Sequence, residues 1–195
     1  MSVASAPTTA TVTPDVTGQY AIDPGHSRIG FVARHAMVTK VRGSFGEFDG
    51  QGYFDAADPS NSRVDLTIQA ASVDTRNADR DAHLRSNDFF AMDTYPEIRF
   101  VSTSVDAVDD NYRVTGELTI KDVTKPVTID FEYTGSAVDP YGNQRLGLEG
   151  KVTVNRKDWG LTWNAALEAG GVLVSDKVTL EFDVSAVKVV ESDNN

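Results

Sequence analysis

The strongest constraint on the fold is an alternation of apolar and polar side chains that recurs in one segment after another. Val64, Leu66 and Ile68 alternate with polar residues, and Val127 and Ile129 open a second run of the same kind. A period of two residues places every apolar side chain on one face, as in a β-strand with one buried and one wetted face. We expect about eight such strands, within residues 29–33, 45–54, 64–68, 98–105, 112–120, 127–133, 146–154 and 178–184.

The segments between these runs have the composition of turns. Asp109-Asp110-Asn111 predicts a tight hairpin, and the Asp-Pro-Tyr-Gly-Asn sequence at 139–143 predicts another. Residues 121–126 form a connection in which Pro126, lacking an N–H donor, is expected at the start of a strand. Many strands joined by short hairpins favour an all-β, up-and-down antiparallel barrel, which leaves no open sheet edge. A two-sheet sandwich is the main alternative.

One stretch, residues 75–100, breaks this pattern. It gathers the charged side chains of Arg80, Asp81, His83, Arg85 and Asp88, and then an aromatic pair at 89–90. We interpret it as a short helical insertion near residues 79–90 that caps the barrel and controls access to its interior.

Bulk properties indicate one domain, expected at residues 19–190. The 195-residue chain has an ordinary soluble composition, and its apolar runs are too short for a membrane helix. Its net charge of −11 argues against nucleic acid and anionic membrane surfaces as partners, and without cysteine it has no thiol chemistry. Residues 1–18 and 191–195 are expected to be disordered tails. The first tail contains no Lys, Arg or apolar core, so it is not a typical signal peptide, and we expect a cytoplasmic location.

Several glycines interrupt the predicted strands, among them Gly43, Gly50, Gly116 and Gly150. Glycine inside a strand is typical of a sharp bend or of deliberate interior space. An eight-stranded barrel either holds one ligand or is filled by its own side chains. The glycines and the aromatic residues between them fit a lined cavity and an ordinary aromatic core equally well.

A set of short motifs, in order along the chain, resembles the YceI-like family from Tyr20 to about Val184. No single motif is specific, but their order and spacing together are. The motifs are Tyr20-x-Ile22-Asp23-x-x-His26-Ser27, Phe31-x-x-x-His35, Val41-x-Gly43-x-Phe45-x-x-Phe48-x-Gly50, Ser72-Val73-x-Thr75, Arg80-Asp81-x-His83-Leu84, Asp88-Phe89-Phe90, Tyr95-Pro96-x-Ile98-x-Phe100, Gly116-x-Leu118-Thr119-Ile120, Lys125-Pro126-Val127, Asn155-Arg156-x-Asp158-Trp159-Gly160 and Val174-Ser175-Asp176-x-Val178.

The resemblance implies a lipocalin-like antiparallel barrel around a long hydrophobic tunnel. It also implies binding of a polyisoprenoid lipid, such as an isoprenoid quinone or a polyprenyl pyrophosphate, with no catalytic residues, no metal and no cofactor beyond the bound lipid. Many members are periplasmic and carry a signal peptide, whereas the first residues of this chain are not expected to form one. Storage, shuttling and protection from stress all fit such a protein, and a homodimer stays open.

Tunnel-lining candidates are the apolar residues on the predicted inward faces. They are Phe31, Phe45, Phe48, Phe54, Leu66, Ile68, Phe100, Leu118, Phe131, Leu148, Trp159, Trp163 and Phe182. His35 shares strand parity with Phe31, which predicts an inward or rim position. Arg34 and Arg42 belong to a local basic patch and are candidates for a head group, since arginine binds phosphate oxygens in pairs.

Two other classes of protein stay open. An enzyme acting on a small amphiphile would use Arg80, Asp81 and His83, although we favour a structural role in which these residues knit the insertion to the barrel. Asn155, Arg156 and Asp158 are likewise expected to fix a corner of the chain. The second alternative is an interaction module whose barrel is filled by its own side chains.

Overall fold

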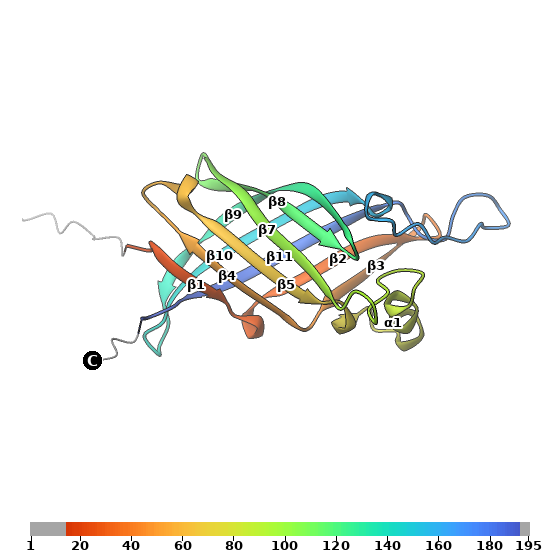
Figure 1. Ribbon diagram of the computed structural model, residues 1–195, viewed down its shortest axis with the longest axis horizontal. Helices are drawn as coiled ribbons and strands as arrows, with labels where there is room; N and C mark the ends of the chain where they lie inside the picture. The colour runs from red at the N-terminus through yellow and green to blue at the C-terminus, as the bar shows by residue number, and fades with distance from the viewer. Residues whose placement is uncertain (1–14, 192–195) are drawn as a thin grey trace, which may run out of the picture.

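The computed structural model describes residues 15–191 and shows one long barrel (Figure 1). The tails predicted at the two ends lie largely outside the described residues. The strands are β1 (Gly18–Ile22), β2 (Arg28–His35), β3 (Thr39–Phe45), β4 (Phe48–Phe54), β5 (Arg63–Gln69), β6 (Val73–Asp74), β7 (Glu97–Val108), β8 (Asn111–Ile120), β9 (Val123–Val138), β10 (Gln144–Asn155) and β11 (Lys177–Lys188). The helices are α1 (Ala78–Arg85) and the short 3-10 turns η1 (Pro24–His26), η2 (Pro59–Asn61), η3 (Ala70–Ser72) and η4 (Arg156–Trp159).

The sheet closes on itself because β1 pairs with β4 on one side and with β11 on the other. Every pairing is antiparallel. The register shows that β1 with β2, β3 with β4, and β5 with β6 are bent strands interrupted near their middle, so that the barrel has eight strands. The predicted antiparallel, lipocalin-like barrel of about eight strands is therefore confirmed, and the two-sheet sandwich is excluded.

Local side chains hold these bends. At the first bend, Asp23 accepts a hydrogen bond from the Gly25 N–H at 3.0 Å and so caps η1. Arg145 then reaches from β10 to the Asp23 carboxylate at 2.8 Å and to that of Asp139 at 2.8 Å. The guanidinium lowers the pKa of Asp23 to about 2 and also lowers that of Asp139. One arginine thus joins the bend to the β9–β10 hairpin.

The predicted helical insertion is confirmed as α1 and the turns that follow it (Figure 1). Asn77 caps the helix, its side-chain oxygen accepting a hydrogen bond from the Arg80 N–H at 2.9 Å. Acidic residues in the first turn and basic residues in the last oppose the helix dipole favourably. The insertion lies against β6 at one end of the barrel.

The prediction for Pro126 was wrong. The connection is a two-residue turn at Lys121 and Asp122, and Pro126 lies inside β9, opposite Glu117 on β8. β10 pairs with β9 only from Asp130 onward, so among residues 15–191 β8 is the only strand beside β9 at Pro126. A proline is tolerated there because the missing N–H removes no bond from a second ladder.

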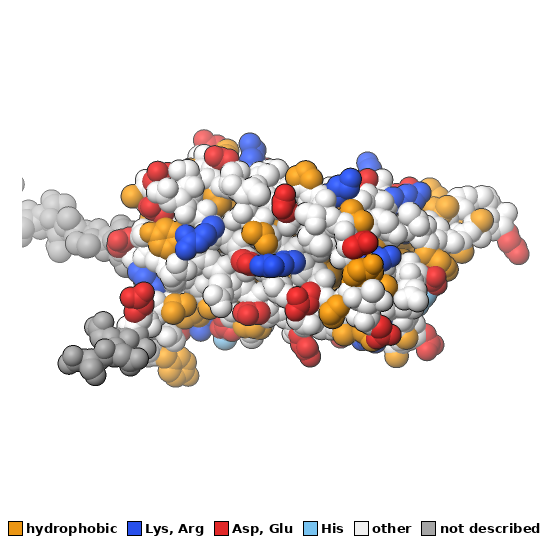
Figure 2. All heavy atoms as spheres, in the orientation of Figure 1, with side chains coloured by type: hydrophobic (Ala, Val, Ile, Leu, Met, Phe, Trp, Pro, Cys, Tyr) orange, Lys and Arg blue, Asp and Glu red, His pale blue; other side chains and the backbone are white. Residues whose placement is uncertain are grey.

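The two ends of the barrel differ. We call the end that carries α1 the helix end, and the end where β1 begins and β11 finishes the terminus end (Figure 1). Figure 2 shows charges of both signs mixed over the visible side wall, with scattered apolar side chains between them. Among residues 15–191, no helix has the length and apolar character needed to cross a bilayer.

Candidate functional site

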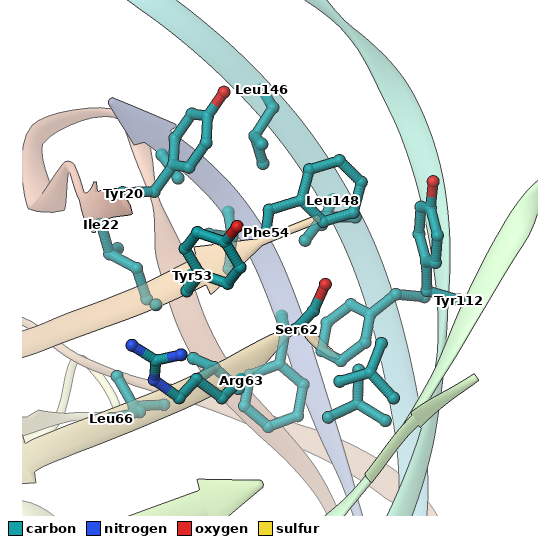
Figure 3. Close-up of a pocket in the computed structure, with 18 of the residues that line it drawn as sticks. Tyr20, Ile22, Tyr53, Phe54, Ser62, Arg63, Leu66, Tyr112, Leu146 and Leu148 are labelled. Atoms are coloured by element: carbon teal, nitrogen blue, oxygen red, sulfur yellow. The ribbon is translucent and has the colours of Figure 1, made fainter. Parts of the chain in front are cut away.

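The interior of the barrel holds two apolar chambers, arranged along its length. Chamber 1 lies toward the terminus end and has a volume of about 140 Å³ (Figure 3). Its walls are inward-facing side chains of the strands, with a few polar residues at the rim. The inward residues are Tyr20, Ile22, Phe54, Val64, Leu66, Phe100, Val105, Tyr112, Val114, Ile129, Phe131, Tyr133, Leu146, Leu148, Phe182, Val184 and Ala186.

Chamber 2 lies toward the helix end and also has a volume of about 140 Å³. The insertion covers it, since Leu84, Phe89 and Phe90 belong to its lining. The Phe90 ring meets that of Phe45 edge-on at 5.8 Å between centroids. The remaining walls come from the strands, from η4 and from the segment after it: Ile29, Phe31, Ala33, Leu66, Ile68, Ile98, Phe100, Leu118, Ile120, Val127, Ile129, Val154, Trp159, Leu161, Val174, Val178, Leu180 and Phe182.

The chambers share the four residues Leu66, Phe100, Ile129 and Phe182, which we call the waist. The chambers therefore adjoin across these side chains, and we call the two chambers together the tunnel. An apolar cavity of about 150 Å³ holds a molecule the size of benzene. A ligand longer than that must pass the waist and occupy both chambers.

Glycines on neighbouring strands let inward aromatic rings lie flat against the wall. A Cβ added at Gly116 would meet the Phe100 ring at 2.5 Å, and one added at Gly150 would meet the Phe131 ring at 2.7 Å. Without a Cβ, these glycines allow a ring to lie directly against the adjacent backbone. The rings therefore extend less far into the barrel and leave more of the tunnel open.

The polar residues that line chamber 1 are four tyrosines, Gln51, Ser62 and Arg63. Tyr20 donates its hydroxyl hydrogen to the Val16 carbonyl at 2.7 Å, and burial raises its pKa to about 12. Burial also raises the pKa of Tyr112, whose ring packs against Tyr133 at 6.1 Å. Within residues 15–191, no protein group hydrogen-bonds to the hydroxyl of Tyr112 or Tyr133. Arg63 lies at the rim, 5.2 Å from the centre of the Tyr53 ring (Figure 3).

The polar group of chamber 2 is Arg156, which is buried. Its Nη1 donates to the carbonyl oxygens of Leu161 at 2.5 Å and Trp163 at 2.9 Å, and its Nε donates to that of Ser175 at 2.9 Å. Burial lowers the pKa of this guanidinium. Its donors are engaged by the chain that follows η4, and Asn155 caps η4 itself. The expected corner-fixing role holds for these two residues, whereas Asp158 is exposed.

The charged residues of the insertion make a structural network. Buried Asp81 accepts hydrogen bonds from the N–H of Thr75 at 2.9 Å and from its hydroxyl at 2.6 Å. Arg80 donates to the same Thr75, with Nε reaching the hydroxyl and Nη2 the carbonyl, both at 2.7 Å. His83 instead contacts Asp88 at 2.8 Å and packs edge-on against Trp163. Arg80 and Asp81 therefore knit the insertion to the barrel, as expected.

The lining of the chambers contains eleven of the predicted ligand contacts: Phe31, Phe45, Phe54, Leu66, Ile68, Phe100, Leu118, Phe131, Leu148, Trp159 and Phe182. Phe48 is buried but lines neither chamber, and Trp163 packs on the insertion. His35 is exposed at the rim of the helix end. Arg34 and Arg42 are exposed as well, and Arg42 faces Glu181 on the outer wall at 3.5 Å. The contact of any of these residues with a ligand stays a prediction.

Sequence reasoning missed Tyr112, Tyr133 and Arg63 as members of the site. Tyr112 and Tyr133 share strand parity with Val114 and Phe131, and this signal was available. Arg63 faces outward by parity, stacks on Tyr53, the residue opposite it on β4, and belongs to the lining of chamber 1. In the described part of the chain, no three His, Asp or Glu side chains are grouped in a way that would hold a metal ion.

Comparison with known proteins decides the family. The model of the YceI-like domain matches residues 20–186. The chain belongs to the YceI-like family. A UPF0312 protein of Staphylococcus aureus is 39% identical over 168 residues, which are 86% of this chain and 95% of that protein. The YceI protein of Campylobacter jejuni superposes with a TM-score of 0.70 at 30% identity, over 80% of this chain and 90% of that one.

A more distant solved structure shares the fold alone. It is a domain from Saccharophagus degradans described as polyisoprenoid-binding and implicated in plant cell wall breakdown. It superposes with a TM-score of 0.66 at 17% identity, over 87% of this chain and 98% of that domain.

Proposed function

We propose that this YceI-like protein binds and shields an elongated apolar lipid in its tunnel, and that it catalyses no reaction. The observation that carries the proposal is the pair of adjoining apolar chambers, closed at one end by the insertion. The ligand class is a polyisoprenoid, either an isoprenoid quinone or a polyprenyl pyrophosphate. The polyisoprenoid-binding description of the Saccharophagus degradans domain supports this class.

The hydrophobic effect is sufficient for such a ligand. Each buried CH₂ contributes about 0.8 kcal/mol, so a few isoprene units reach the roughly 8 kcal/mol of a micromolar complex. Association and ordering of the chain cost about 4–15 kcal/mol, so longer chains are needed for tight binding. The tunnel's two chambers suit a long, thin molecule because a compact one would fill only one of them.

The head group is assigned to chamber 1 in this proposal. The cation of chamber 2, Arg156, already donates to backbone carbonyls, so it has little capacity for a phosphate. Chamber 1 offers the unengaged hydroxyls of Tyr112 and Tyr133 inside and Arg63 at its rim. A quinone carbonyl would accept from a tyrosine, whereas a pyrophosphate would stay at the rim with Arg63.

The first test is native mass spectrometry of the freshly purified protein, with extraction of anything bound. The expected result is a mass shift that disappears on extraction and yields an isoprenoid. The same spectrum reports whether the protein is a homodimer. A clean apo mass, together with no uptake of added retinol or farnesyl pyrophosphate, would contradict the proposal and favour a filled barrel.

Variants locate the ligand. Gly150→Trp places a large side chain against Phe131 inside the barrel, and Leu148→Trp fills chamber 1 without that clash. Lys151→Trp is the matched control, because Lys151 is exposed on the same strand. Both inward variants should abolish retinol uptake, and the control should retain it. Arg63→Met should weaken farnesyl pyrophosphate binding and spare retinol, and an equal effect on both would remove Arg63 from the head-group site.

A further inference from the structure

Two hairpins project beyond the barrel at the helix end (Figure 1). The first is the β2–β3 turn, residues 35–39, and the second is the hairpin at residues 165–174. They are joined edge to edge, since the Ala36 N–H donates to the Leu173 carbonyl at 2.8 Å and His35 bridges to Val174. We call these two hairpins together the tip.

The tip exposes apolar side chains. Met37 is 64% exposed, Val38 73% and Val172 38%. Single exposed apolar residues are ordinary on a protein surface, but here three gather on joined hairpins that extend away from the body. No other described segment covers them.

The β2–β3 turn is also strained. Ala36 and Met37 have φ of +50° and +61°, and the Val38 N–H closes the turn on the His35 carbonyl at 3.1 Å. Such a turn normally uses Asn or Gly at these positions, because other residues are disfavoured at positive φ. Strained residues persist where the conformation serves a function, and here the strain presents a large apolar side chain to the outside.

Two cations and one carboxylate lie on or beside the tip. Arg34, which donates to the Val38 carbonyl at 3.2 Å, and Lys40 flank the β2–β3 turn, and Glu168 is the carboxylate on the other hairpin. The terminus end is acidic, with carboxylates at positions 55, 58, 106, 109, 110 and 139. Strands of the length of β11 hold these ends about 25 Å apart or more, even when tilted by about 45°. Because charges are screened over about 8 Å in physiological salt, the tip does not feel the acidic end.

We propose that the tip docks the protein, end-on, onto the surface of a lipid bilayer. Met37, Val38 and Val172 would enter the apolar side of the interface, with Arg34 and Lys40 at the level of anionic head groups. The carboxylates of the terminus end, which contribute to the overall charge of −11, point away from the bilayer, whereas Asp79, Asp88 and Asp93 of the insertion lie at the helix end and weaken the attraction to anionic head groups. Docking places the bilayer beside chamber 2, whose lining extends to Ala33 and Val174 at the base of the tip. From this position, lipid would pass from the bilayer into the tunnel. Only this passage of lipid rests on the proposed function, and the docking itself does not.

A site-specific dye tests the contact directly. The chain has no cysteine, so Val38→Cys gives a single labelling site for an environment-sensitive dye. Tyr141→Cys, at a position 90% exposed at the terminus end, is the matched control. With vesicles of phosphatidylcholine and 30% phosphatidylglycerol, the dye at position 38 should shift to the blue and be quenched by lipid-borne quenchers, while the dye at 141 should not. No shift at position 38, or equal shifts at both, would overturn the proposal.

Binding measurements give the energetic test. Each exposed side chain of this size, withdrawn from water, strengthens binding about tenfold or more. Met37→Ser with Val38→Ser should therefore weaken vesicle binding at least about tenfold, whereas Val138→Ser with Tyr141→Ser should not. Arg34→Gln with Lys40→Gln should lower binding to the phosphatidylglycerol vesicles and leave weak binding to pure phosphatidylcholine unchanged.

Retinol uptake separates the two proposals. The Met37→Ser, Val38→Ser variant should still take up retinol from solution, because neither residue lines a chamber. If the wild type binds vesicles but no retinol, docking stands and the proposed function fails. If the wild type takes up retinol but does not bind vesicles, the docking proposal fails. The docking proposal would also be refuted if the tip bound a protein partner instead of a bilayer.

Discussion

Replacing Arg156 by methionine should release the segment that follows η4 and leave the barrel intact. The methionine side chain replaces the apolar stem of the arginine but not its guanidinium, so the change removes the charge and the donors and leaves a small space where the guanidinium lay. Three short hydrogen bonds are lost, to the carbonyls of Leu161, Trp163 and Ser175, and one long contact of 3.4 Å to that of Val174. This arginine is 6% exposed, so water does not readily replace those bonds in the closed segment.

The magnitude follows from two opposing terms. Hydrogen bonds from a charged donor contribute about 1.5–3 kcal/mol each, which gives roughly 4–9 kcal/mol for the three short bonds. Burying the guanidinium costs several kcal/mol, as the lowered pKa indicates, and methionine escapes that cost. We expect a net loss of about 3–5 kcal/mol, confined to residues 160–176 because the segment can open while the barrel stays paired.

Hydrogen exchange followed by mass spectrometry measures this loss by segment. A loss of about 3 kcal/mol speeds exchange roughly a hundredfold in peptides from 160–176, with β8 as the internal reference. The exchange rate of Arg156→Lys in these peptides should lie between those of the wild type and Arg156→Met, because lysine keeps the charge but not the planar fork of donors. Unchanged exchange in 160–176 would refute the reasoning, and so would an equal increase in β8, which would assign Arg156 to the whole barrel.

Three further predictions concern single side chains. The pKa of Asp23 is lowered to about 2 by its hydrogen bond from Arg145, so the stability it contributes is present above pH 4 and is lost as pH falls toward 2. In urea titrations between pH 4 and pH 2, the free energy of unfolding of Asp23→Asn should therefore fall less steeply than that of the wild type. The pKa of Tyr20 is raised to about 12, so its contribution is lost as pH rises from about 10 to 12, and Tyr20→Phe should remove that part of the alkaline loss while costing about 1 kcal/mol at neutral pH. Asp81→Ala should lower the free energy of unfolding by about 2–4 kcal/mol because both donors of Thr75 lose their acceptor; a catalytic role would instead require a lost turnover at unchanged stability.

Parity along a strand is a local property, and the inward faces were therefore predictable. Side chains two residues apart share a face whatever the partner strand is, so Leu66, Phe100, Phe131 and Phe182 could be assigned inward from sequence. The same reasoning predicts the number of strands, because turns are encoded by their own residues. The family motifs add the closure of the barrel, which parity alone does not distinguish from a sandwich.

Depth along the barrel is not local. Phe48 and Phe45 have the same character and lie three residues apart, yet Phe45 lines chamber 2 and Phe48 does not. The difference depends on the pairing register of the whole sheet. The side chains that face each phenylalanine across the barrel come from strands three or more places away in the sheet. Trp163 was misplaced for a similar reason, since η4 and the Arg156 bonds direct its segment onto the insertion.

Alternation, turn residues and the charged insertion predicted by themselves an antiparallel all-β fold with one apolar face on each strand and a short capping insertion, and the family motifs favoured the barrel over the sandwich. Only the tertiary structure decided that the interior is two chambers with a waist, that Arg63 and the tyrosines mark one end, and that Arg34 lies beside an exposed tip. The physical reason is range. Strand and turn preferences act between residues a few positions apart, whereas a cavity and its ends exist only where side chains distant in sequence meet, or leave space, across a closed sheet.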